Sequence, residues 1–506
     1  MDVFGDLIGG FEVALTPTNL GLAFLGCLLG TMIGALPGLG PSNGVAILIP
    51  LAFTLGLPPT SALIMLTSVY YGAMYGGRIS SILLNIPGDE PALMTTLDGY
   101  PMAKQGRAGE ALALSGVASF VGGFFATVGL VLFAPLLARV ALLFGPAEYF
   151  ALYTLAFATL GGIASRNQAK AAMAAAIGLG IAMIGIDFAT GIPRYTFGNM
   201  HLFEGIDFLV AIVGLFAISE VLLFLEHQGA QTAVGMKLGR ITVPLKELIR
   251  CGPTMARSTV LGFVAGVLPG AGASLGSFIA YTIEKRVVDR EGTFGKGDPR
   301  GVAAPEAGNN AAAGGALVPM LTLGVPGSGT TAVLLAMLLT LNITPGPLLF
   351  QQQPDVVWGL IAALFIGNFM LLVMNIPLVG LFVRLLMVPS HNLMPAVAMI
   401  GFVGIYSISG SVFDLLVMVV FGVIGYLLRK LDVPLVPIIL GILLGNQMED
   451  NLRRALQISN GEWSILWGSP LALGLWIAAV VGFIAPLLIG RFVRPSTPAA
   501  VEADPD

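Results

Sequence analysis

The stretch GCLLGTMIGALPGLGPSNG, residues 26–44, decides how this chain folds. It starts as an apolar helix with a glycine at every fourth position and then breaks at Leu36-Pro37-Gly38. A second stretch, GFVAGVLPGAGASLG at residues 262–276, repeats its glycines, its Leu-Pro-Gly and its serine at a constant offset of 232 residues. A duplicated interruption inside apolar sequence is the best sequence-level pointer to a transporter binding site.

The composition indicates an integral membrane protein. Of the 506 residues, 56% are hydrophobic and only 10% are charged, whereas soluble domains carry about 25% charged residues. At about 20 residues per span, the length allows on the order of ten to thirteen transmembrane or re-entrant helices, so we predict an all-α, polytopic membrane protein. The net charge of −4 does not suggest nucleic-acid binding. Cys27 and Cys251 imply no disulfide framework.

Basic residues divide the chain. We predict a first membrane half at residues 1–226, a basic cytoplasmic linker at 227–257, a second membrane half at 258–490 and a polar C-terminal tail at 491–506. No lysine or arginine flanks the first Leu-Pro-Gly break, whereas the second break lies between two basic clusters. Because basic loops tend to stay in the cytoplasm, we expect two inverted-repeat halves with an outward-facing N-terminus.

Each half carries a second interruption. Gly77 lies ten residues before Pro87-Gly88, and Gly315 lies eleven residues before Pro326-Gly327. Helix packing and simple kinking could account for one such motif, but four motifs in matching order favour broken helices that line a site. Such backbone is tolerated at membrane depth only where protein or a water-filled cavity satisfies its polar groups. At the two Leu-Pro-Gly motifs, which are the first interruption of each half, the predicted structural breaks are Pro37, Gly38, Gly40, Pro269, Gly270 and Gly272.

Side chains beside these breaks are candidates for a binding site. Broken helices offer free N–H groups, which suit carboxylates, and free carbonyl oxygens, which suit Na⁺. Hydroxyl and amide side chains can bind the same groups without a buried charge. The predicted substrate-binding residues are Ser42, Asn43, Arg78, Ser80, Ser81, Asn85, Ser274, Asn309, Asn310, Ser328, Thr330 and Thr331. The predicted ion-binding residues, through backbone or side chain, are Pro87, Gly88, Asp89, Gly324, Pro326 and Gly327.

Ionisable residues near the breaks have two interpretations. Arg78 either faces an anionic substrate or extends from a helix end to the membrane surface. Asp89, Glu90, Asp98 and Glu306 either contribute to ion or proton coupling or are loop charges. The second interpretation is favoured for Glu90 and Asp98.

Both repeats also spell G-x-S-x-G, around Ser42 and Ser274, which could indicate a serine nucleophile. That motif requires a strand–turn–helix context, which is not expected here. A catalytic serine also needs a base, and neither a metal-binding nor a nucleotide-binding motif is present in the sequence. We therefore predict that the protein is not an enzyme and that it uses no cofactor apart from a coupling ion.

Four stretches of the sequence resemble the large membrane subunit of the tripartite tricarboxylate transporter family. They are GALPGLGPSNGVAILIPLAF (34–53), YYGAMYGGRISSILLNIPGDEPALMTTLDGYPMAKQGRAGEAL (70–112), GVLPGAGASLGSFIAY (266–281) and PEAGNNAAAGGALVPMLTLGVPGSGTTAVLLAML (305–338). The likeness extends over almost the whole chain, to about residue 490.

The resemblance implies a multi-pass protein of the bacterial inner membrane that imports di- or tricarboxylates such as citrate. It implies two protein partners, a small membrane subunit and a periplasmic solute-binding protein, and a Na⁺ or proton gradient as the driving force. The alternative from the residues alone is a passive channel or a membrane scaffold, because selectivity filters also contain broken helices.

Overall fold

The computed structural model describes residues 3–36, 38–162, 167–187, 190–226, 239–270, 272–385 and 390–492. The first part of the chain forms ten α-helices and one short β-hairpin: α1 (Val3–Ala14), α2 (Pro17–Ala35), α3 (Gly40–Thr54), α4 (Pro59–Leu84), α5 (Leu93–Met102), α6 (Ala108–Ala141), α7 (Pro146–Gly162), α8 (Gln168–Ala182), β1 (Gly185–Ile186), β2 (Pro193–Arg194), α9 (Phe208–Ile212) and α10 (Ser219–Glu226). Strands β1 and β2 are antiparallel.

The remainder is helical: α11 (Leu245–Val267), α12 (Gly272–Val288), α13 (Pro299–Leu323), α14 (Gly329–Thr340), α15 (Leu349–Gln352), α16 (Pro354–Asn375), α17 (Val379–Leu385), α18 (Ser390–Ser409), α19 (Val412–Lys430), α20 (Val436–Ile458) and α21 (Pro470–Phe492). The predicted linker at 227–257 overlaps α11, which includes residues 245–257. Pro37, residues 227–238 and residues 493–506 lie outside the described residues.

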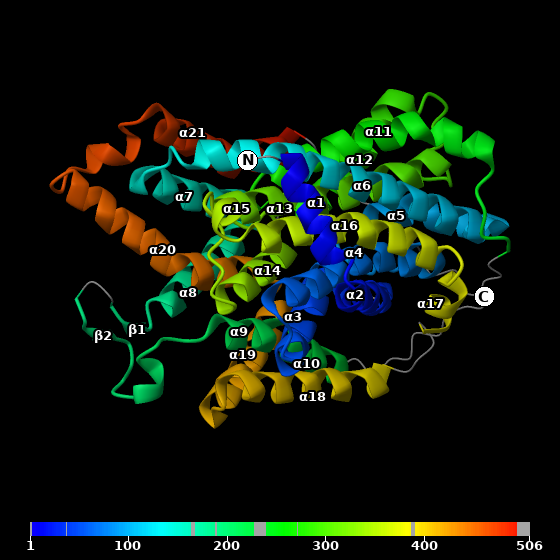
Figure 1. The fold of residues 1–506 in the computed structure, drawn as a ribbon. Coiled ribbons are helices and arrows are strands. Elements are labelled where there is room, and N and C mark those ends of the chain that lie inside the picture. Colours follow the sequence, from blue (N-terminus) through cyan, green and yellow to red (C-terminus); the bar gives the residue numbers. More distant parts are fainter. Residues whose placement is uncertain are drawn as a thin grey trace.

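The predicted all-α membrane fold is confirmed. Five helical stretches of the described chain are long and apolar enough to cross a membrane: Pro17–Ala35, Leu93–Ala141, Phe208–Glu226, Pro354–Asn375 and Val412–Lys430. Five shorter apolar helices accompany them. Figure 1 shows α4 and α13 inside this bundle. In α13, Arg300 is the one residue that is not buried. Its many Gly and Ala residues suit a helix that packs closely on several sides.

The glycine stripes exist because the helices touch backbone to backbone. A Cβ added to Gly30 would lie 2.3 Å from the carbonyl oxygen of Val69 in α4, and one added to Gly34 would lie 2.0 Å from that of Ala73. In the second half the stripe of α11 packs in the same way on α13, with Gly262 against Gly308 and Gly266 against Ala312. The α2–α4 pair is therefore repeated as α11–α13.

The two repeats are inverted. The open end of the α2–α3 hairpin lies beside the start of α4, where Ser61 donates to Asn19 at 2.7 Å. The open end of the α11–α12 hairpin lies where Glu284 accepts a hydrogen bond from Thr254. The loop after this hairpin meets the turn that follows α5, where Gln105 donates to the carbonyl of Lys296. Because α4 crosses the bundle between these two places, the hairpins enter from opposite ends.

The second interruption in each half folds the chain back on itself. After α4, Gly88 lies against Gly77, so that a Cβ added to Gly88 would lie 2.6 Å from the Cα of Gly77. After α13, Gly327 lies in the same way against Ala316, at 2.8 Å. Each long helix is thus followed by an extended segment that returns beside it and by a shorter helix, α5 or α14.

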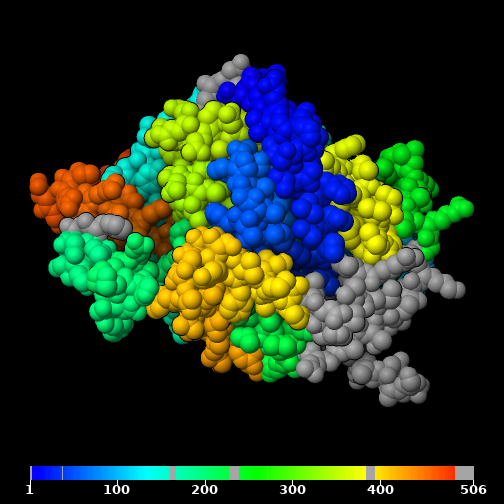
Figure 2. Space-filling view, turned by 60° about the horizontal axis from the view of Figure 1, so that its bottom comes forward, coloured from blue at the N-terminus to red at the C-terminus, as the bar shows by residue number. Residues whose placement is uncertain are grey.

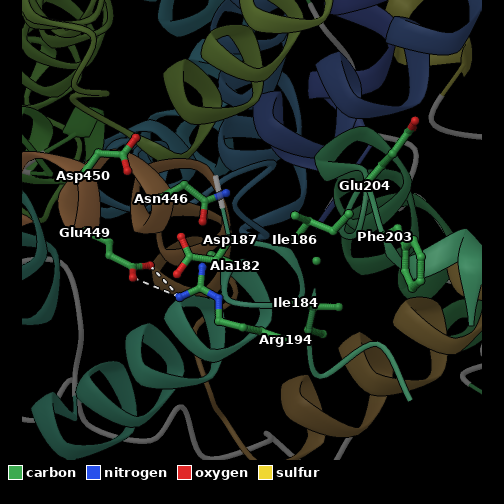
Figure 3. A pocket seen from close by; sticks show the side chains of 11 residues that line it. Ala182, Ile184, Ile186, Asp187, Arg194, Phe203, Glu204, Asn446, Glu449 and Asp450 are labelled. Atoms are coloured by element: carbon green, nitrogen blue, oxygen red, sulfur yellow. Dashed lines mark hydrogen bonds and ion pairs between the residues drawn. The ribbon is translucent and has the colours of Figure 1, made fainter. Parts of the chain in front are cut away.

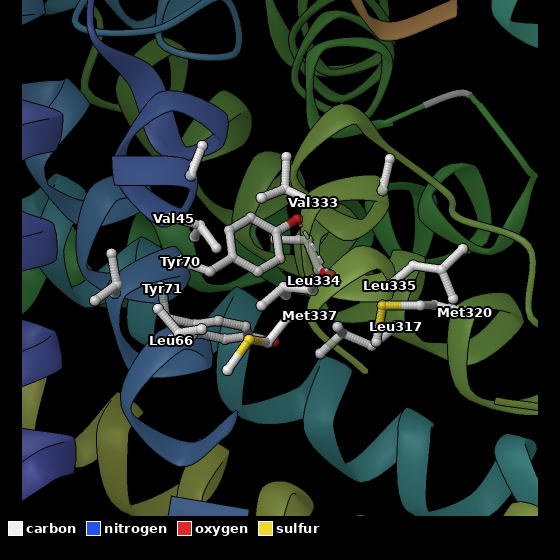
Figure 4. Close-up of a cluster of buried hydrophobic side chains, with 14 of the residues drawn as sticks. Val45, Leu66, Tyr70, Tyr71, Leu317, Met320, Val333, Leu334, Leu335 and Met337 are labelled. Carbon is white, nitrogen blue, oxygen red and sulfur yellow. Dashed lines mark hydrogen bonds between the residues drawn. The ribbon is translucent and has the colours of Figure 1, made fainter. Parts of the chain in front are cut away.

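The other helices form the flanks of the bundle. Helix α8 packs on α20 through Gly178 and Gly441, and α18 packs on α3 through Gly404 and Pro50. Figure 2 shows α18, in orange-yellow, beside the blue N-terminal helices. In the centre, apolar side chains of α3, α4, α13 and α14 form one cluster that includes Val45, Tyr70, Leu317 and Val333 (Figure 4). This cluster holds the interrupted segments of both halves together.

Candidate substrate site between the interrupted helices

The tip of each hairpin has the same backbone conformation. Leu36 and Leu268 are extended (φ −77°, ψ 120° and φ −73°, ψ 123°) and end α2 and α11. Two glycines with positive φ follow each of them: Gly38 and Gly40 in the first half, Gly270 and Gly272 in the second. A residue with a Cβ rarely adopts this conformation, so both glycines of each tip are required by the turn.

The fold-back segments also repeat, at an offset of 239 residues. Asn85 and Gly324 end α4 and α13 in the left-handed conformation. Asp89 accepts a hydrogen bond from the Ala92 N–H at 2.9 Å, as Ser328 accepts one from the Thr331 N–H at 3.2 Å. At this offset the counterpart of Gly76 is Gly315. The sequence alone could not show this, because the distance from the glycine pair to the following Pro-Gly differs by one residue between the halves.

Within each half, the hairpin tip is bonded to the fold-back segment. The Gly38 N–H donates to the Gly88 carbonyl at 3.2 Å, and the Gly272 N–H donates to the Gly327 carbonyl at 3.0 Å. The carbonyls of Gly88 and Gly327 therefore already accept one hydrogen bond each. A Cβ added to Gly40 would lie 3.6 Å from the Cβ of Asp89, and one added to Gly272 would lie 3.6 Å from that of Ser328.

The two halves meet at these tips. The hydroxyls of Ser42 and Thr330 are 3.0 Å apart. In the matching contact, Ser274 donates to Glu90 at 3.3 Å, and Ser277 donates to the carbonyl of Pro91 at 2.7 Å. Each hairpin serine thus touches the other half: Ser42 meets the first turn of α14, and Ser274 meets the fold-back segment before α5.

This arrangement brings helix N-termini together. Helices α3 and α14 begin on the two sides of the Ser42–Thr330 contact, and α12 begins beside Glu90, shortly before α5. Helix α14 is capped by Ser328, whereas no described side chain caps α3. Free N–H groups and the helix dipole make such a place attractive to an anion. The geometry suits carboxylate binding without a cationic side chain.

The sequence also matches a known protein family. The sequence model of the tripartite tricarboxylate transporter TctA family matches residues 20–440. The chain belongs to this family. A TctA-family chain is the large subunit of a tripartite tricarboxylate transporter, and this one is a multi-pass membrane protein.

Two proteins of Agrobacterium vitis are similar to this TctA-family chain. An uncharacterized 52.8 kDa protein in the TAR-I ttuC' 3'region is 40% identical over 488 residues, which cover 96% of this chain and 97% of that protein. An uncharacterized protein in the TAR-II ttuC' 3'region is 40% identical over 228 residues, 44% of this chain and 94% of that protein. No solved structure matches.

Several predicted residues do lie together in the TctA-family chain. Ser42, Ser328 and Thr330 surround the contact between α3 and α14, and Ser274 lies at the matching contact. Thr331 is fully buried and completes the capping box of α14 with Ser328. Their roles in binding remain predictions.

Other predicted residues lie inside the helix bundle instead. Arg78 is fully buried, and its guanidinium donates to Ser115 and to the carbonyls of Tyr75 and Leu112. Arg78 therefore does not extend to the membrane surface, and these N–H groups bind protein atoms and not a substrate. Ser80 and Ser81 donate to the carbonyl of Gly77. Two further residues are buried in α13, namely Asn309 and Asn310, whereas Asn85 is exposed at the end of α4.

The sequence did not point to two charged residues beside the first tip. Glu220 of α10 and Arg429 of α19 form an ion pair, and Asn43 is bonded to both of them. A Cβ added to Gly38 would lie 4.0 Å from the Glu220 carboxylate. The available signal was that Glu220 is the one charged residue between positions 208 and 225 of this apolar run. Tyr70, whose hydroxyl donates to the carbonyl of Ala313, was missed as well.

Two other acidic residues are structural. Asp98 is buried and is not a loop charge, because it accepts from the N–H groups of Gly295, Gly297 and Asp298 and from the Tyr281 hydroxyl. Burial acts to raise the pKa of Asp298, but hydrogen bonds from Arg300 and Thr293 hold that pKa below its usual range. These contacts fix the loop before α13.

A cavity of about 400 Å³ lies away from the interrupted helices, between the β-hairpin and α20 (Figure 3). Asp187, Glu204, Glu449 and Asp450 line it together with Arg194. Arg194 and Arg453 both pair with Glu449, and Arg453 also pairs with Asp187. Four carboxylates make this cavity unsuited to a tricarboxylate, so it does not compete with the tips as the substrate site.

Proposed function

We propose that this chain is the permease subunit of a binding-protein-dependent secondary transporter that imports di- or tricarboxylates, such as citrate, into bacteria. The observation that carries the proposal is the contact between the uncapped N-terminus of α3 and the N-terminus of α14, which come from opposite halves. Substrate carboxylates bind there through backbone N–H groups and the hydroxyls of Ser42, Thr330 and Ser274.

The coupling ion, Na⁺ or a proton, binds near Asp89. The Asp89 residue is 9% exposed, and one of its carboxylate oxygens, Oδ2, has no hydrogen-bond partner among the described residues. It lies beside Gly77 and Gly40, at the fold-back segment that holds the first tip. A carboxylate oxygen beside bent backbone is a suitable cation ligand.

Two further proteins complete the transporter. Membership of the family implies that they are a small membrane subunit and a periplasmic binding protein. The binding protein captures the carboxylate and delivers it to this subunit in the inner membrane.

Uptake by proteoliposomes tests the proposal. The two membrane subunits are reconstituted, the purified binding protein is added outside, and labelled citrate uptake is measured under imposed Na⁺ or proton gradients. Accumulation that requires both the binding protein and a gradient is expected. Flux that ignores the gradient would show a channel and overturn the proposal.

A variant of Asp89 tests the ion site in the same assay. Asp89→Asn keeps the side-chain oxygen that caps Ala92 but removes the charge, so citrate uptake should lose its stimulation by the cation gradient. Glu204→Gln, in the remote cavity, is the matched control and should retain it. Unchanged stimulation in Asp89→Asn would remove Asp89 from the ion site.

A further inference from the structure

The crossing of α4 and α13 contains polar groups that the proposed site does not use. The helices are antiparallel because the halves are inverted, and they touch where Tyr70 donates to the carbonyl of Ala313. A Cβ added to Gly314 would lie 2.8 Å from the Tyr71 hydroxyl. One turn further on, this register places Tyr75 at the level of Asn310.

Besides the Tyr71 hydroxyl, three further side-chain atoms at this crossing have no hydrogen-bond partner among the described residues. They are the hydroxyl of Tyr75, Nη2 of Arg78 and Oδ1 of Asn310. All three side chains are 0% exposed. Buried polar groups are almost always hydrogen-bonded, to protein or to ordered water, because an unpaired one is costly. Three in one place indicate a bound ligand.

The chemistry of the three atoms selects the ligand. Nη2 of Arg78 can only donate, Oδ1 of Asn310 can only accept, and the Tyr75 hydroxyl can do both. An anion would satisfy the arginine but not the amide oxygen, and a cation would be repelled by the arginine. Water both donates and accepts, so it fits all three.

Glu306 lies at the end of this polar group. Its carboxylate accepts from Thr95 of α5 at 2.6 Å and from Ser119 of α6 at 2.8 Å. The charged and titratable groups that act on it electrostatically are Arg78 and Tyr75 of α4 and Asp89. Asn310, one turn along α13, donates to its main-chain carbonyl. From α11 and α12, small residues pack against this part of α13.

We propose that ordered water at the α4–α13 crossing, held in place by Arg78 and Asn310, forms with the Tyr75 hydroxyl one hydrogen-bonded chain that delivers a solvent proton to Glu306. The proton ends on Oε2 of Glu306, and the Ser119 hydroxyl, which donated to this oxygen, then accepts from it and turns its own hydrogen to the carbonyl of Ser115. Neutral Glu306 leaves the charge of Arg78 unbalanced between the two halves. Protonation thereby changes how α4, α5, α6 and α13 hold together. The proton relay rests on the proposed function, whereas the presence of bound water at the crossing does not depend on that function.

Radiolytic labelling tests the water. X-ray pulses in H₂¹⁸O oxidise buried side chains that lie beside bound water, and mass spectrometry gives the labelling rate of each tyrosine. Tyr75 is expected to be labelled several-fold faster than Tyr153, which is slightly more exposed but has its hydroxyl bonded to Gln447. Asn310→Leu should slow the labelling of Tyr75. Equal rates for Tyr75 and Tyr153 would overturn the proposal, whatever the transport assay shows.

Uptake under an inward proton gradient tests the relay. Tyr75→Phe and Glu306→Gln should each lose most of the stimulation by the gradient, while Tyr153→Phe keeps it. Tyr75→Phe removes only a hydroxyl that has no partner in the part of the chain that the structure describes, so it remains informative if Glu306→Gln does not fold. Full proton stimulation in Tyr75→Phe would overturn the relay. An inactive wild-type protein would instead count against the proposed function, and the labelling result would still stand.

Discussion

At the scale of single residues, Ser42 occupies the first turn of α3 and faces Thr330 across the two halves. Its side chain is partly exposed, and its only described partner is another hydroxyl, which can rotate away. Each hydroxyl can then donate to a carboxylate while the helix N-termini supply the positive potential. The site therefore needs no buried arginine, which agrees with the interior position of Arg78.

Ser42→Ala should weaken citrate uptake without unfolding the protein. Loss of one hydrogen bond costs about 0.5–1.5 kcal/mol, so KM should rise by about two- to tenfold. Thr18→Ala, an exposed change at the start of α2, is the matched control. Concentration-dependent uptake in proteoliposomes measures both variants. An unchanged KM for Ser42→Ala would remove this hydroxyl from the site.

The roles of residues within one local sequence pattern could be predicted. The contacts between residues far apart in the sequence could not. The turns at the two tips depend on residues with positive φ, and the sequence shows these positions because they are glycines: Gly38, Gly40, Gly270 and Gly272. The fate of Arg78 depends on Leu112 and Ser115 in another helix. The Glu220–Arg429 pair joins residues 209 positions apart, and no local spacing encodes it.

At the scale of elements, each fold-back segment depends on a glycine that lies against the backbone of two helices. A Cβ added to Gly88 would lie 2.3 Å from the carbonyl oxygen of Gly34 and 2.6 Å from the Cα of Gly77. Backbone atoms cannot move aside as a side chain end can. Gly88→Ala should therefore push the segment off α4, at a cost of at least about 1–3 kcal/mol.

Thermal unfolding in detergent tests Gly88→Ala. Its midpoint should fall by several degrees or the folded yield should collapse, and Gly327→Ala should behave alike because Gly327 lies against Ala316 and Gly266. Gly252→Ala, in α11 where a Cβ meets nothing within 4 Å, should be neutral or stabilising. Equal midpoints for Gly88→Ala and Gly252→Ala would refute the close packing.

The first hairpin is also tied to α10 and α19 through the Asn43–Glu220–Arg429 group. The Glu220 and Arg429 side chains are 15% and 21% exposed, whereas the neighbouring Glu226–Lys430 pair is 39% and 42% exposed. A double-mutant cycle of Glu220→Gln and Arg429→Gln should give a coupling of about 1.5–3 kcal/mol. The same cycle on Glu226 and Lys430 should give about 0.2–1 kcal/mol. Similar couplings for both pairs would show that Glu220–Arg429 is an ordinary surface pair.

At the scale of the whole molecule, the inverted repeat gives the two tips the same backbone surroundings from opposite sides. Hairpin α2–α3 contacts the first turn of α14 in the second half, and hairpin α11–α12 contacts the fold-back segment of the first half. A site built from both halves can open toward either side when the halves or the flanking helices move. Motifs in matching order predicted this symmetry. Whether Gly314 or Gly315 corresponds to Gly76 could be decided only from the structure, in which Gly315 contacts Phe263 and Gly266.

Inversion makes a prediction about which loops face the same side of the membrane. Helix α6 crosses from the end where Arg250 and Asp298 lie, α7 returns, and α8 crosses again, so the β-hairpin is expected at the same end as Thr18. Arg290, in the loop after α12, is expected at the other end, which the positive-inside rule places in the cytoplasm. The buried Cys27 and Cys251 are replaced by serine, and single cysteines are introduced at the exposed positions Thr18, Tyr195 and Arg290. An impermeant maleimide added to right-side-out vesicles should label Thr18→Cys and Tyr195→Cys, and should label Arg290→Cys only after the vesicles are opened. Labelling of Thr18→Cys and Arg290→Cys from one side would contradict the inversion, and with it a substrate site formed by hairpins that enter from opposite faces.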